Sequence, residues 1–258
     1  MRPLTELDPN GVGALLFDID DTLTTSGKLT AAAYASLERW KFAGKRAVAV
    51  TGRPAGWCDH IARMWPIDAV VGENGAFYFT FASGRLQKQY HDPPETRARN
   101  HARLADIGRN IVAAVTGCAI AADQPYRETD LAIDYCEDVA PLPLEAAERI
   151  AGLMRAAGLH AKVSSIHVNG WFGEYDKLTM TRQLFREQFG TGLDRERAAV
   201  VYVGDSPNDA PMFEFFPNSV GVANIKRFAS MVKTTPTFVT NASSGAGFAE
   251  LVEHLLRA

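Results

Sequence analysis

Three carboxylates lie within four positions near the start of the chain. Asp18, Asp20 and Asp21 follow the apolar run at residues 14–17. Carboxylates a few ångströms apart repel one another and raise each other's pKa, so a cluster of them is costly unless a cation lies beside it. A hard cation such as Mg²⁺ takes oxygen ligands and would resolve this conflict. The plainer alternative is an acidic turn that caps a helix.

A second group of oxygen donors follows another apolar run, at residues 199–203. Gly204 and Asp205 come directly after this run, and Asn208 and Asp209 follow on the same turn. Turn formation explains glycine, serine, proline and asparagine here, but not a second acidic cluster. Ligands of open parallel sheets bind outside the carboxyl ends of the strands, where both clusters would lie. We therefore expect the two clusters to meet and to share a metal ion.

Two weaker signals could serve a phosphoryl group. Thr51 and Gly52 follow the apolar run at residues 47–50 and offer a hydroxyl and a backbone amide, although such a turn is common without any ligand. Asp176 is placed to cap a helix that extends to residue 190, which puts Lys177 in its first turn. The helix dipole disfavours a cation there, so an anion beside Lys177 would explain its position. A solvated surface lysine is the alternative.

Strand-like and helix-like segments alternate in the first and last thirds of the chain. Continuous apolar runs of this kind are typical of strands that are buried on both faces. A helix over residues 30–44 is indicated by Thr30 as N-cap and Gly44 as terminator. This alternation predicts an α/β fold with a parallel sheet. The runs lie at residues 14–17, 47–50, 69–71, 199–203 and 219–222.

The middle of the chain has a different pattern, typical of a small α+β module. Here we expect a hairpin at residues 77–81 and 85–90, helices at 94–115 and 144–157, and strands at 131–135 and 162–168. We place this insert at residues 85–174. The flanking residues 1–84 and 175–258 would then form one discontinuous core domain.

Composition excludes several classes of protein. The chain has 258 residues, of which 47% are hydrophobic, and a formal net charge of -3. This charge argues against a nucleic-acid binder that relies on neutralising phosphates. No apolar run approaches the roughly 18 residues of a membrane span, and no secretory signal pattern is visible. We therefore expect a soluble cytoplasmic protein, monomeric or homodimeric, without nucleic-acid or membrane partners.

Taken together, these segments resemble the haloacid dehalogenase (HAD) superfamily of phosphohydrolases. The pattern of that family is hhhhDxDxT, then hhhT or hhhS, then Lys, then hhhhGDxxND, where h is apolar. The long insert and the Gly-Glu-Asn-Gly-Ala turn at residues 72–76 are similar to the type IIB cap subgroup, which includes Cof-like and sucrose-phosphate phosphatases. The resemblance implies a Rossmann-like parallel-sheet core with an inserted α+β cap. The four matching elements are residues 15–22, residues 48–51, Lys177 and residues 201–209.

The resemblance also implies a role for each residue of the motifs. Asp18 would attack phosphorus to form an aspartyl-phosphate, and Asp20 would act as general acid and base. Mg²⁺ would be held by the side chains of Asp18 and Asp205 and by the backbone carbonyl of Asp20. Thr51 and the backbone amide of Gly52 would bind the transferring oxygens, and Lys177 would neutralise charge on the phosphoryl group and on Asp18. Asn208 and Asp209 would orient the water ligands of the metal and Lys177 from behind, and Asp21 would only support the turn.

The substrate implied by the resemblance is a small-molecule phosphate ester, with a sugar phosphate or glycosyl phosphate favoured. The cap would close over the leaving group, and the polar and aromatic residues at 167–171 suit a sugar. An equally good interpretation of this segment is a half-buried strand with incidental polar residues. A phosphomutase of the phosphomannomutase type and a catalytically idle, metal-dependent binding protein are the alternative functions. The candidate substrate contacts are Thr22, Gly52, Arg53 and Asn74 in the core and His167, Asn169 and Trp171 in the cap.

Overall fold

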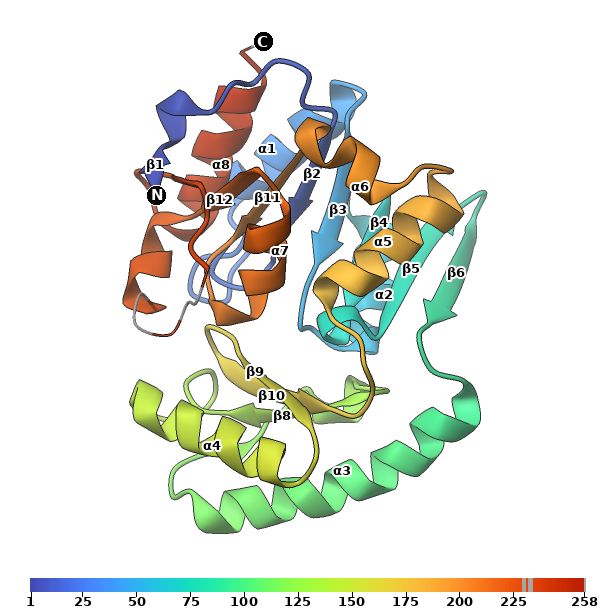
Figure 1. Ribbon diagram of the computed structural model, residues 1–258, viewed down its shortest axis with the longest axis vertical. Coiled ribbons are helices and arrows are strands. Elements are labelled where there is room, and N and C mark those ends of the chain that lie inside the picture. Colours follow the sequence, from blue (N-terminus) through green and yellow to red (C-terminus); the bar gives the residue numbers. More distant parts are fainter. Residues whose placement is uncertain (229–230, 232–233, 258) are drawn as a thin grey trace.

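A large, mainly parallel sheet forms the centre of the upper part of the protein in Figure 1. The computed structural model describes residues 1–228, 231 and 234–257, and within these residues the sheet has nine strands in the order β1-β13-β12-β11-β2-β3-β4-β5-β6. Only β5 and β6 run antiparallel to their neighbours. The strands are β1 (Arg2–Pro3), β2 (Ala14–Phe17), β3 (Arg46–Val50), β4 (Ala69–Gly72), β5 (Phe77–Ala82), β6 (Arg85–Tyr90), β11 (Val200–Gly204), β12 (Asn218–Gly221) and β13 (Phe238–Val239).

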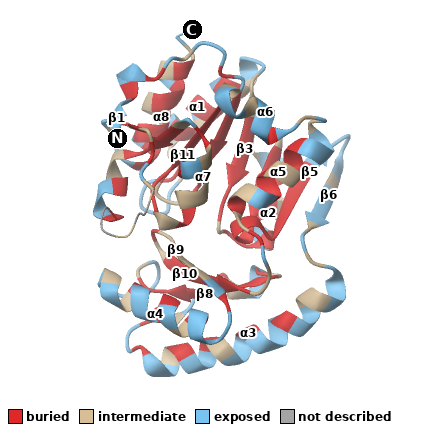
Figure 2. Cartoon of the chain, in the orientation of Figure 1, coloured by how far each residue is buried: buried red, intermediate tan, exposed pale blue. Residues whose placement is uncertain are grey.

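Helices cover both faces of this sheet, which is why its central strands are apolar throughout. α1 (Ala31–Phe42), α2 (Ala55–Met64) and α8 (Ser244–Leu255) pack on one face. α5 (Lys177–Gln188), α6 (Leu193–Glu196) and α7 (Ala210–Phe215) pack on the other. Figure 2 shows the strands between these layers as buried, as expected for a doubly covered parallel sheet. The predicted α/β fold with a parallel-sheet core is confirmed.

Local interactions fix the ends of the two helices that the sequence delimits most clearly. The Thr30 side chain accepts a hydrogen bond from the backbone N–H of Ala33 at the start of α1. Asp176 does the same for the backbone N–H of Thr179 at the start of α5, so Lys177 is the first helical residue. Both N-caps are those predicted.

A smaller antiparallel sheet lies below the carboxyl ends of the large sheet's strands (Figure 1). Its strands, β7 (Ala119–Ile120), β8 (Asp130–Asp134), β9 (His160–Val163) and β10 (His167–Trp171), have the order β7-β8-β10-β9 among the described residues. α3 (Pro94–Ala114) and α4 (Leu144–Ala156) cover the face of this sheet that points away from the core. We refer to residues 94–171 as the cap.

The structure corrects two details of the expected insert. Residues 85–90, which we expected to open the insert, form β6 and pair with β5 along their whole length in the large sheet. The single strand expected at residues 162–168 is instead two strands, β9 and β10, because Ser164 forms a turn in which its backbone N–H and its hydroxyl donate to the carbonyl of His167. We therefore propose a boundary after Tyr90 in place of residue 84.

Short 3₁₀ helices join many of these elements, and some of them carry residues of the candidate active site. They are η1 (Leu4–Glu6), η2 (Glu73–Gly75), η3 (Gln124–Tyr126), η4 (Arg197–Ala199), η5 (Pro207–Asp209) and η6 (Ala223–Phe228). Among residues 1–228, 231 and 234–257, no helix is both long and apolar enough to cross a bilayer.

Candidate active site

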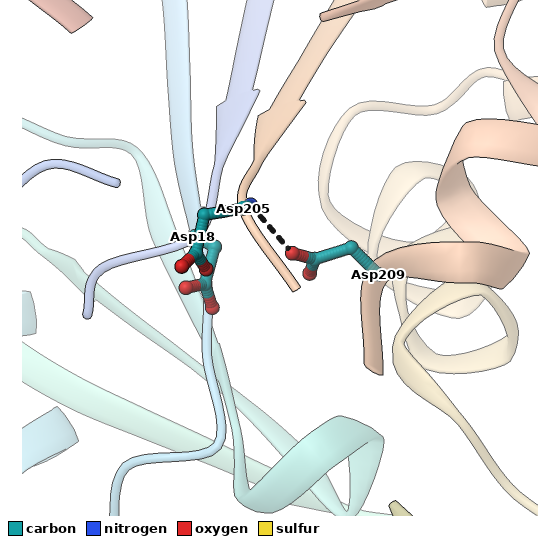
Figure 3. Close-up of side chains that lie close together, drawn as sticks. All are labelled: Asp18, Asp205 and Asp209. Atoms are coloured by element: carbon teal, nitrogen blue, oxygen red, sulfur yellow. Dashed lines mark hydrogen bonds between the residues drawn. The ribbon is translucent and has the colours of Figure 1, made fainter. Parts of the chain in front are cut away.

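Two adjacent strands bring the acidic clusters together at the carboxyl edge of the large sheet. β2 and β11 pair in parallel with Phe17 opposite Val203, so the residues that follow these two strands are neighbours. The backbone N–H of Asp18 donates to the carbonyl of Val203 at 2.9 Å. One carboxylate oxygen from each of Asp18, Asp205 and Asp209 lies within 4.8 Å of the others, and all three residues are buried (Figure 3).

Lys177 is the cation that faces this cluster. Its Nζ donates to Asp18 Oδ1 and to Asp209 Oδ1, both at 2.7 Å, and only 2% of the residue is exposed. Burial alone would lower the pKa of Lys177, but the carboxylates of Asp18 and Asp209 raise it above its usual value. The ammonium group is therefore charged, and its position against the dipole of α5 is explained by these two anions.

The remaining charge in the cluster is not balanced. The pKa of Asp18 is raised to about 7, mainly by burial. The negative charges of Asp209 and Asp20 also raise this pKa, and the positive charge of Lys177 lowers it in part. Burial, together with Asp18 and Asp209, also raises the pKa of Asp205 well above its usual value. Three buried carboxylates that share one ammonium group thus carry an excess of negative charge.

Asp205 offers the free oxygen that a metal would use. Its Oδ2 accepts a hydrogen bond from Asn224 Nδ2 at 3.1 Å, whereas its buried Oδ1 has no partner among the described residues. Asp209 is different, because Oδ1 accepts from Lys177 and Tyr202 and Oδ2 from the backbone N–H groups of Asp205 and Ser206. The donor set therefore fits Mg²⁺ with Asp18 and Asp205 as ligands and Asp209 behind them.

The candidate phosphate contacts lie on the neighbouring loops. The carbonyl of Thr51 accepts a hydrogen bond from the backbone N–H of Asn74 at 3.1 Å, which ties the loops after β3 and β4 together. Asn74 Oδ1 accepts from Asn208 Nδ2 at 3.3 Å, while the buried Asn74 Nδ2 and Thr22 Oγ1 have no partner among the described residues. Asn74 packs closely against Gly52, since a Cβ there would lie 3.1 Å from Asn74 Nδ2. Buried donors without acceptors are suited to bind the oxygens of an anion.

Asp20 does not join the cluster of Asp18, Asp205 and Asp209 but pairs with Arg53. Arg53 Nε and Nη2 donate to Asp20 Oδ1 at 3.0 and 2.8 Å, and Nε also donates to Oδ2 at 2.9 Å. The same guanidinium donates to Glu137 in the cap at 2.5 Å and to Asp123 at 3.3 Å. Sequence reasoning missed Glu137 and Asp123, because they lie 70 or more positions from Arg53 and no motif marks them.

Asn224 is a further residue without a sequence signal. From η6, its Nδ2 donates to the carbonyl of Asp21 at 2.9 Å and to Asp205 Oδ2 at 3.1 Å. Its Oδ1 accepts from the backbone N–H of Ser244 at 2.8 Å. It thereby orients Asp205 and joins the two acidic loops to the start of α8.

Comparison with known proteins supports the resemblance found in the motifs. The sequence profile of the haloacid dehalogenase-like hydrolases matches residues 15–117, which include the acidic turn at Asp18 and the loop at Thr51. The chain is 28% identical over 241 residues to a phosphoglycolate phosphatase of Haloarcula marismortui, covering 92% of this chain and 95% of that protein. These matches confirm the resemblance to the HAD-like hydrolases.

Solved structures support this HAD fold, including its cap. The protein of Thermoplasma acidophilum known as 0175 matches with a TM-score of 0.69 and 18% identity, over 96% of this chain and 99% of that one. A sugar phosphatase of HAD subclass IIB matches with a TM-score of 0.62 and 15% identity, over 95% of this chain and 99% of that one. The predicted resemblance to this family, the α/β fold with an inserted cap and the hydrolase class are confirmed.

Within this HAD cap, two of the three expected sugar contacts have structural partners instead. Trp171 is 2% exposed and its Nε1 donates to the carbonyl of Tyr175, and Asn169 Nδ2 donates to Asp130 Oδ2 at 2.9 Å. The expected role of Asn169 and Trp171 in substrate binding is therefore corrected, since both side chains are buried among residues of the chain. His167 lies nearer the site, with Nε2 2.8 Å from Glu137 Oε2.

Proposed function

We propose that this HAD-like hydrolase is a Mg²⁺-dependent phosphatase that cleaves a small phosphorylated metabolite through an aspartyl-phosphate on Asp18. The observation that carries the proposal is the environment of Asp18. This buried carboxylate is bonded to a buried lysine and lies beside Asp205, whose Oδ1 has no partner among the described residues. Such a site can bind a metal and present a nucleophilic carboxylate to a phosphorus atom.

In the first step an Asp18 oxygen forms a bond to phosphorus, and the bond from phosphorus to the leaving oxygen breaks. Asp20 gives a proton to that leaving oxygen. Of its two oxygens, Oδ2 has the fewer hydrogen bonds among the described residues, one from Arg53 Nε, so it has room for this proton. In the second step water attacks phosphorus, Asp20 takes the proton of the water, and Asp18 is released.

The transferring oxygens are bound by groups that surround Asp18. Lys177 balances their charge, and the hydroxyl of Thr51 and the unpartnered Nδ2 of Asn74 donate hydrogen bonds to them. Where Mg²⁺ binds, the side chains of Asp18 and Asp205 and, by family resemblance, the backbone carbonyl of Asp20 would hold it, and it offsets the negative charge of the phosphoryl group.

For the substrate we propose a sugar phosphate or glycosyl phosphate, with phosphoglycolate as the competing candidate. The curated relative from Haloarcula marismortui is named a phosphoglycolate phosphatase, and a neighbour in fold is a sugar phosphatase. The partner is a small molecule in either case. We further propose that the protein acts in the cytoplasm as a monomer or homodimer.

The test is replacement of the nucleophile. Asp18→Asn is expected to abolish Mg²⁺-dependent phosphate release, while circular dichroism and thermal unfolding show an intact fold. Asp21→Asn is the matched control, because Asp21 has a φ of 54°, which asparagine tolerates, and we expect it to keep at least about half of the activity. Substantial hydrolysis by Asp18→Asn, in protein free of contaminating phosphatase, would overturn the nucleophile assignment.

The same assay separates the two alternative functions. With mannose 1-phosphate and a bisphosphate activator, release of free phosphate supports a phosphatase, and formation of the 6-phosphate without free phosphate supports a mutase. If no ester in a panel of sugar phosphates, phosphoglycolate and nucleotide monophosphates is hydrolysed with Mg²⁺, the protein is a metal-dependent binding protein instead.

A further inference from the structure

A cavity of about 480 Å³ opens beside Asp20, between the loop after β2 and helix α2. Asp20 and Arg53 form one wall, and Trp57 and Trp65 of the α2 region form another. Tyr126, on η3 of the cap, also lines the cavity. Neither Asp18 nor Asp205 lines it, so the cavity extends away from the metal-binding carboxylates on the side of the proposed proton donor.

This position is that of a leaving-group site. A general acid must contact the leaving oxygen, so the group attached to that oxygen lies next to Asp20. The cavity begins at Asp20 and has room for a ring with its substituents. Phosphorus bound at Asp18 and a leaving group in this cavity would thus lie on the two sides of Asp20.

Two aromatic side chains of the cavity are exposed, although large aromatic side chains elsewhere in the chain are buried. Trp57 is 42% exposed and Tyr126 is 58% exposed, whereas Trp40 and Trp171 of the same chain are at most 2% exposed. The guanidinium carbon of Arg53 lies 4.3 Å from the centre of a Trp57 ring, which holds that side chain against the cavity wall. Exposed rings that gather around a hollow next to a catalytic group are suited to stack on a ligand.

Tyr126 is held in this place by the residues beside it. Gly56 leaves room for the cap here, because a Cβ at that position would lie 3.0 Å from the Cβ of Tyr126. The next residue, Arg127, is buried and donates to the carbonyl of Gly52 at 2.9 Å and to Asp123 at 2.9 Å. These contacts hold the backbone at Tyr126 beside the cavity, so its ring is placed at the cavity's edge.

The charges around the cavity disfavour a second anionic group on the ligand. All three guanidinium nitrogens of Arg53 already donate to carboxylates, namely those of Asp20, Asp123 and Glu137. Hydrogen bonds from Arg53 and His167 lower the pKa of Glu137 to about 2 in spite of its burial, so this carboxylate is ionised. An added carboxylate in the cavity would lie beside Asp20 and find the Arg53 guanidinium already paired, so His60 is the other basic side chain of the lining that it could contact.

We propose that this cavity, formed by Trp57, Trp65 and Tyr126 beside Asp20, binds the leaving group of the substrate and selects an uncharged ring. The inference rests on the proposed phosphatase function and specifies its substrate class as a phosphate monoester of a ring-bearing alcohol without a second anion. Stacking of the ring places the ester oxygen at Asp20. Phosphoglycolate, whose leaving group carries a carboxylate and no ring, is outside this class.

The test compares kcat/KM for four esters with Mg²⁺: benzyl phosphate, glucose 6-phosphate, ethyl phosphate and phosphoglycolate. At least one of the two ring esters is expected to exceed both ethyl phosphate and phosphoglycolate by roughly tenfold or more, as stacked contacts of this kind allow. A preference for benzyl phosphate indicates an apolar ring, and a preference for glucose 6-phosphate indicates a hydroxylated one. Both results support the proposal, while equal or better turnover of phosphoglycolate overturns it.

Variants test whether this cavity is the cause. Trp57→Ala and Tyr126→Ala remove exposed side chains and should fold normally, and each is expected to lower the ratio of kcat/KM for the ring ester to that for ethyl phosphate about fivefold or more. Phe42→Ala, which removes an 83% exposed ring on α1, is the control and should leave the ratio unchanged.

A second cavity provides the competing outcome. It has about 380 Å³, shares Asp20 and Arg53 with the first cavity, and is otherwise lined by residues that include Asp21, Ser165 and Arg227. If Arg227→Ala changes the ratio and Trp57→Ala does not, the leaving group occupies that cavity and the proposal is wrong. If no ester is hydrolysed at all, the proposed function fails rather than the assignment of the ring site.

Discussion

Asp18 and Asp205 are buried side by side, and a single ammonium group, that of Lys177, faces them and Asp209. The raised pKa values of both aspartates express the cost of this arrangement, which a divalent cation would remove. The sequence predicted these acidic residues because each follows an apolar strand directly. It could not predict Asn224, since a lone asparagine in a loop has no pattern that separates it from a turn residue.

The raised pKa of Asp18, about 7, makes a prediction about metal binding. Below pH 7 a proton occupies the carboxylate and has to leave when Mg²⁺ binds. We therefore expect the affinity for Mg²⁺ to rise between pH 6 and 8, by up to about tenfold per pH unit for each proton released. Because the pKa of Asp205 is raised as well, its proton adds to this dependence.

Isothermal titration calorimetry in buffers of different ionisation enthalpy measures both the affinity and the number of protons released. In the absence of metal, the stability of the fold has the opposite pH dependence: it falls as the pH rises. The folded protein holds the Asp18 proton up to about pH 7, whereas the unfolded chain loses it near 3.8, so this group lowers the stability as the pH rises between these values. A Mg²⁺ affinity that does not change between pH 6 and 7 would contradict the prediction.

At the scale of elements, the start of α5 determines where Lys177 lies. Gly75, in η2, has a φ of +108°, and a Cβ at this position would lie 2.0 Å from the carbonyl oxygen of Asp176. The residue that caps α5 therefore packs directly on the backbone of the turn after β4. Only glycine permits both this close approach and this backbone conformation.

Gly75→Ala is thus expected to push the start of α5 away and to displace the ammonium group of Lys177. We expect a loss of about 3 kcal/mol or more in the free energy of unfolding and at least a tenfold loss of kcat, because small displacements of catalytic groups are costly. Urea unfolding and phosphate release measure the two effects.

Gly84→Ala is the matched control for this substitution. Gly84 also has a positive φ, +73°, but no atom of the described residues lies within 4 Å of the position of a Cβ. It should cost only about 1 kcal/mol, from backbone strain, and leave kcat unchanged. Equal effects of the two substitutions would show that packing on Asp176 is unimportant.

Most elements could be predicted because their signals are local. Thr30 and Asp176 indicate the starts of the helices that they cap, and the apolar runs before Asp18 and Asp205 indicate buried strands. The division of residues 162–168 into two strands could not be predicted, because it depends on hydrogen bonds of Ser164 that compete with continuous pairing. Trp171 was misjudged since an aromatic ring suits a sugar and a hydrophobic core equally well.

At the scale of the whole molecule, the contacts between cap and core join residues that are far apart in the chain. Arg53 pairs with Glu137, and Arg227 donates to the carbonyl of Ser165 at 3.0 Å. Such pairs involve charged residues that look like ordinary surface positions in the sequence. The sequence pattern predicts that a cap is inserted. It does not predict which residues attach the cap to the core.

Another attachment of the cap is at Glu73, a fully buried residue in the turn after β4. Its carboxylate accepts hydrogen bonds from the backbone N–H groups of Ala55, Glu128, Thr129 and Asp130 and from the hydroxyl of Thr129. Three of these N–H groups belong to the cap and one to α2. The carboxylate thus fixes one edge of the cap, while the edge at Glu137 is joined by an ion pair across the site.

Glu73→Ala removes the common acceptor of these N–H groups and leaves them buried. Because each unsatisfied group costs about 1–3 kcal/mol, we expect a loss of at least about 3 kcal/mol in the free energy of unfolding. Amide hydrogen exchange at residues 128–130 should accelerate by more than tenfold, while exchange in β2 and β11 follows only the global loss. Glu250→Ala is the control, since Glu250 also accepts backbone N–H groups, those of Asn241 and Ala242, but within the core. If exchange at residues 128–130 rises no more in Glu73→Ala than in Glu250→Ala, the cap is held by other contacts.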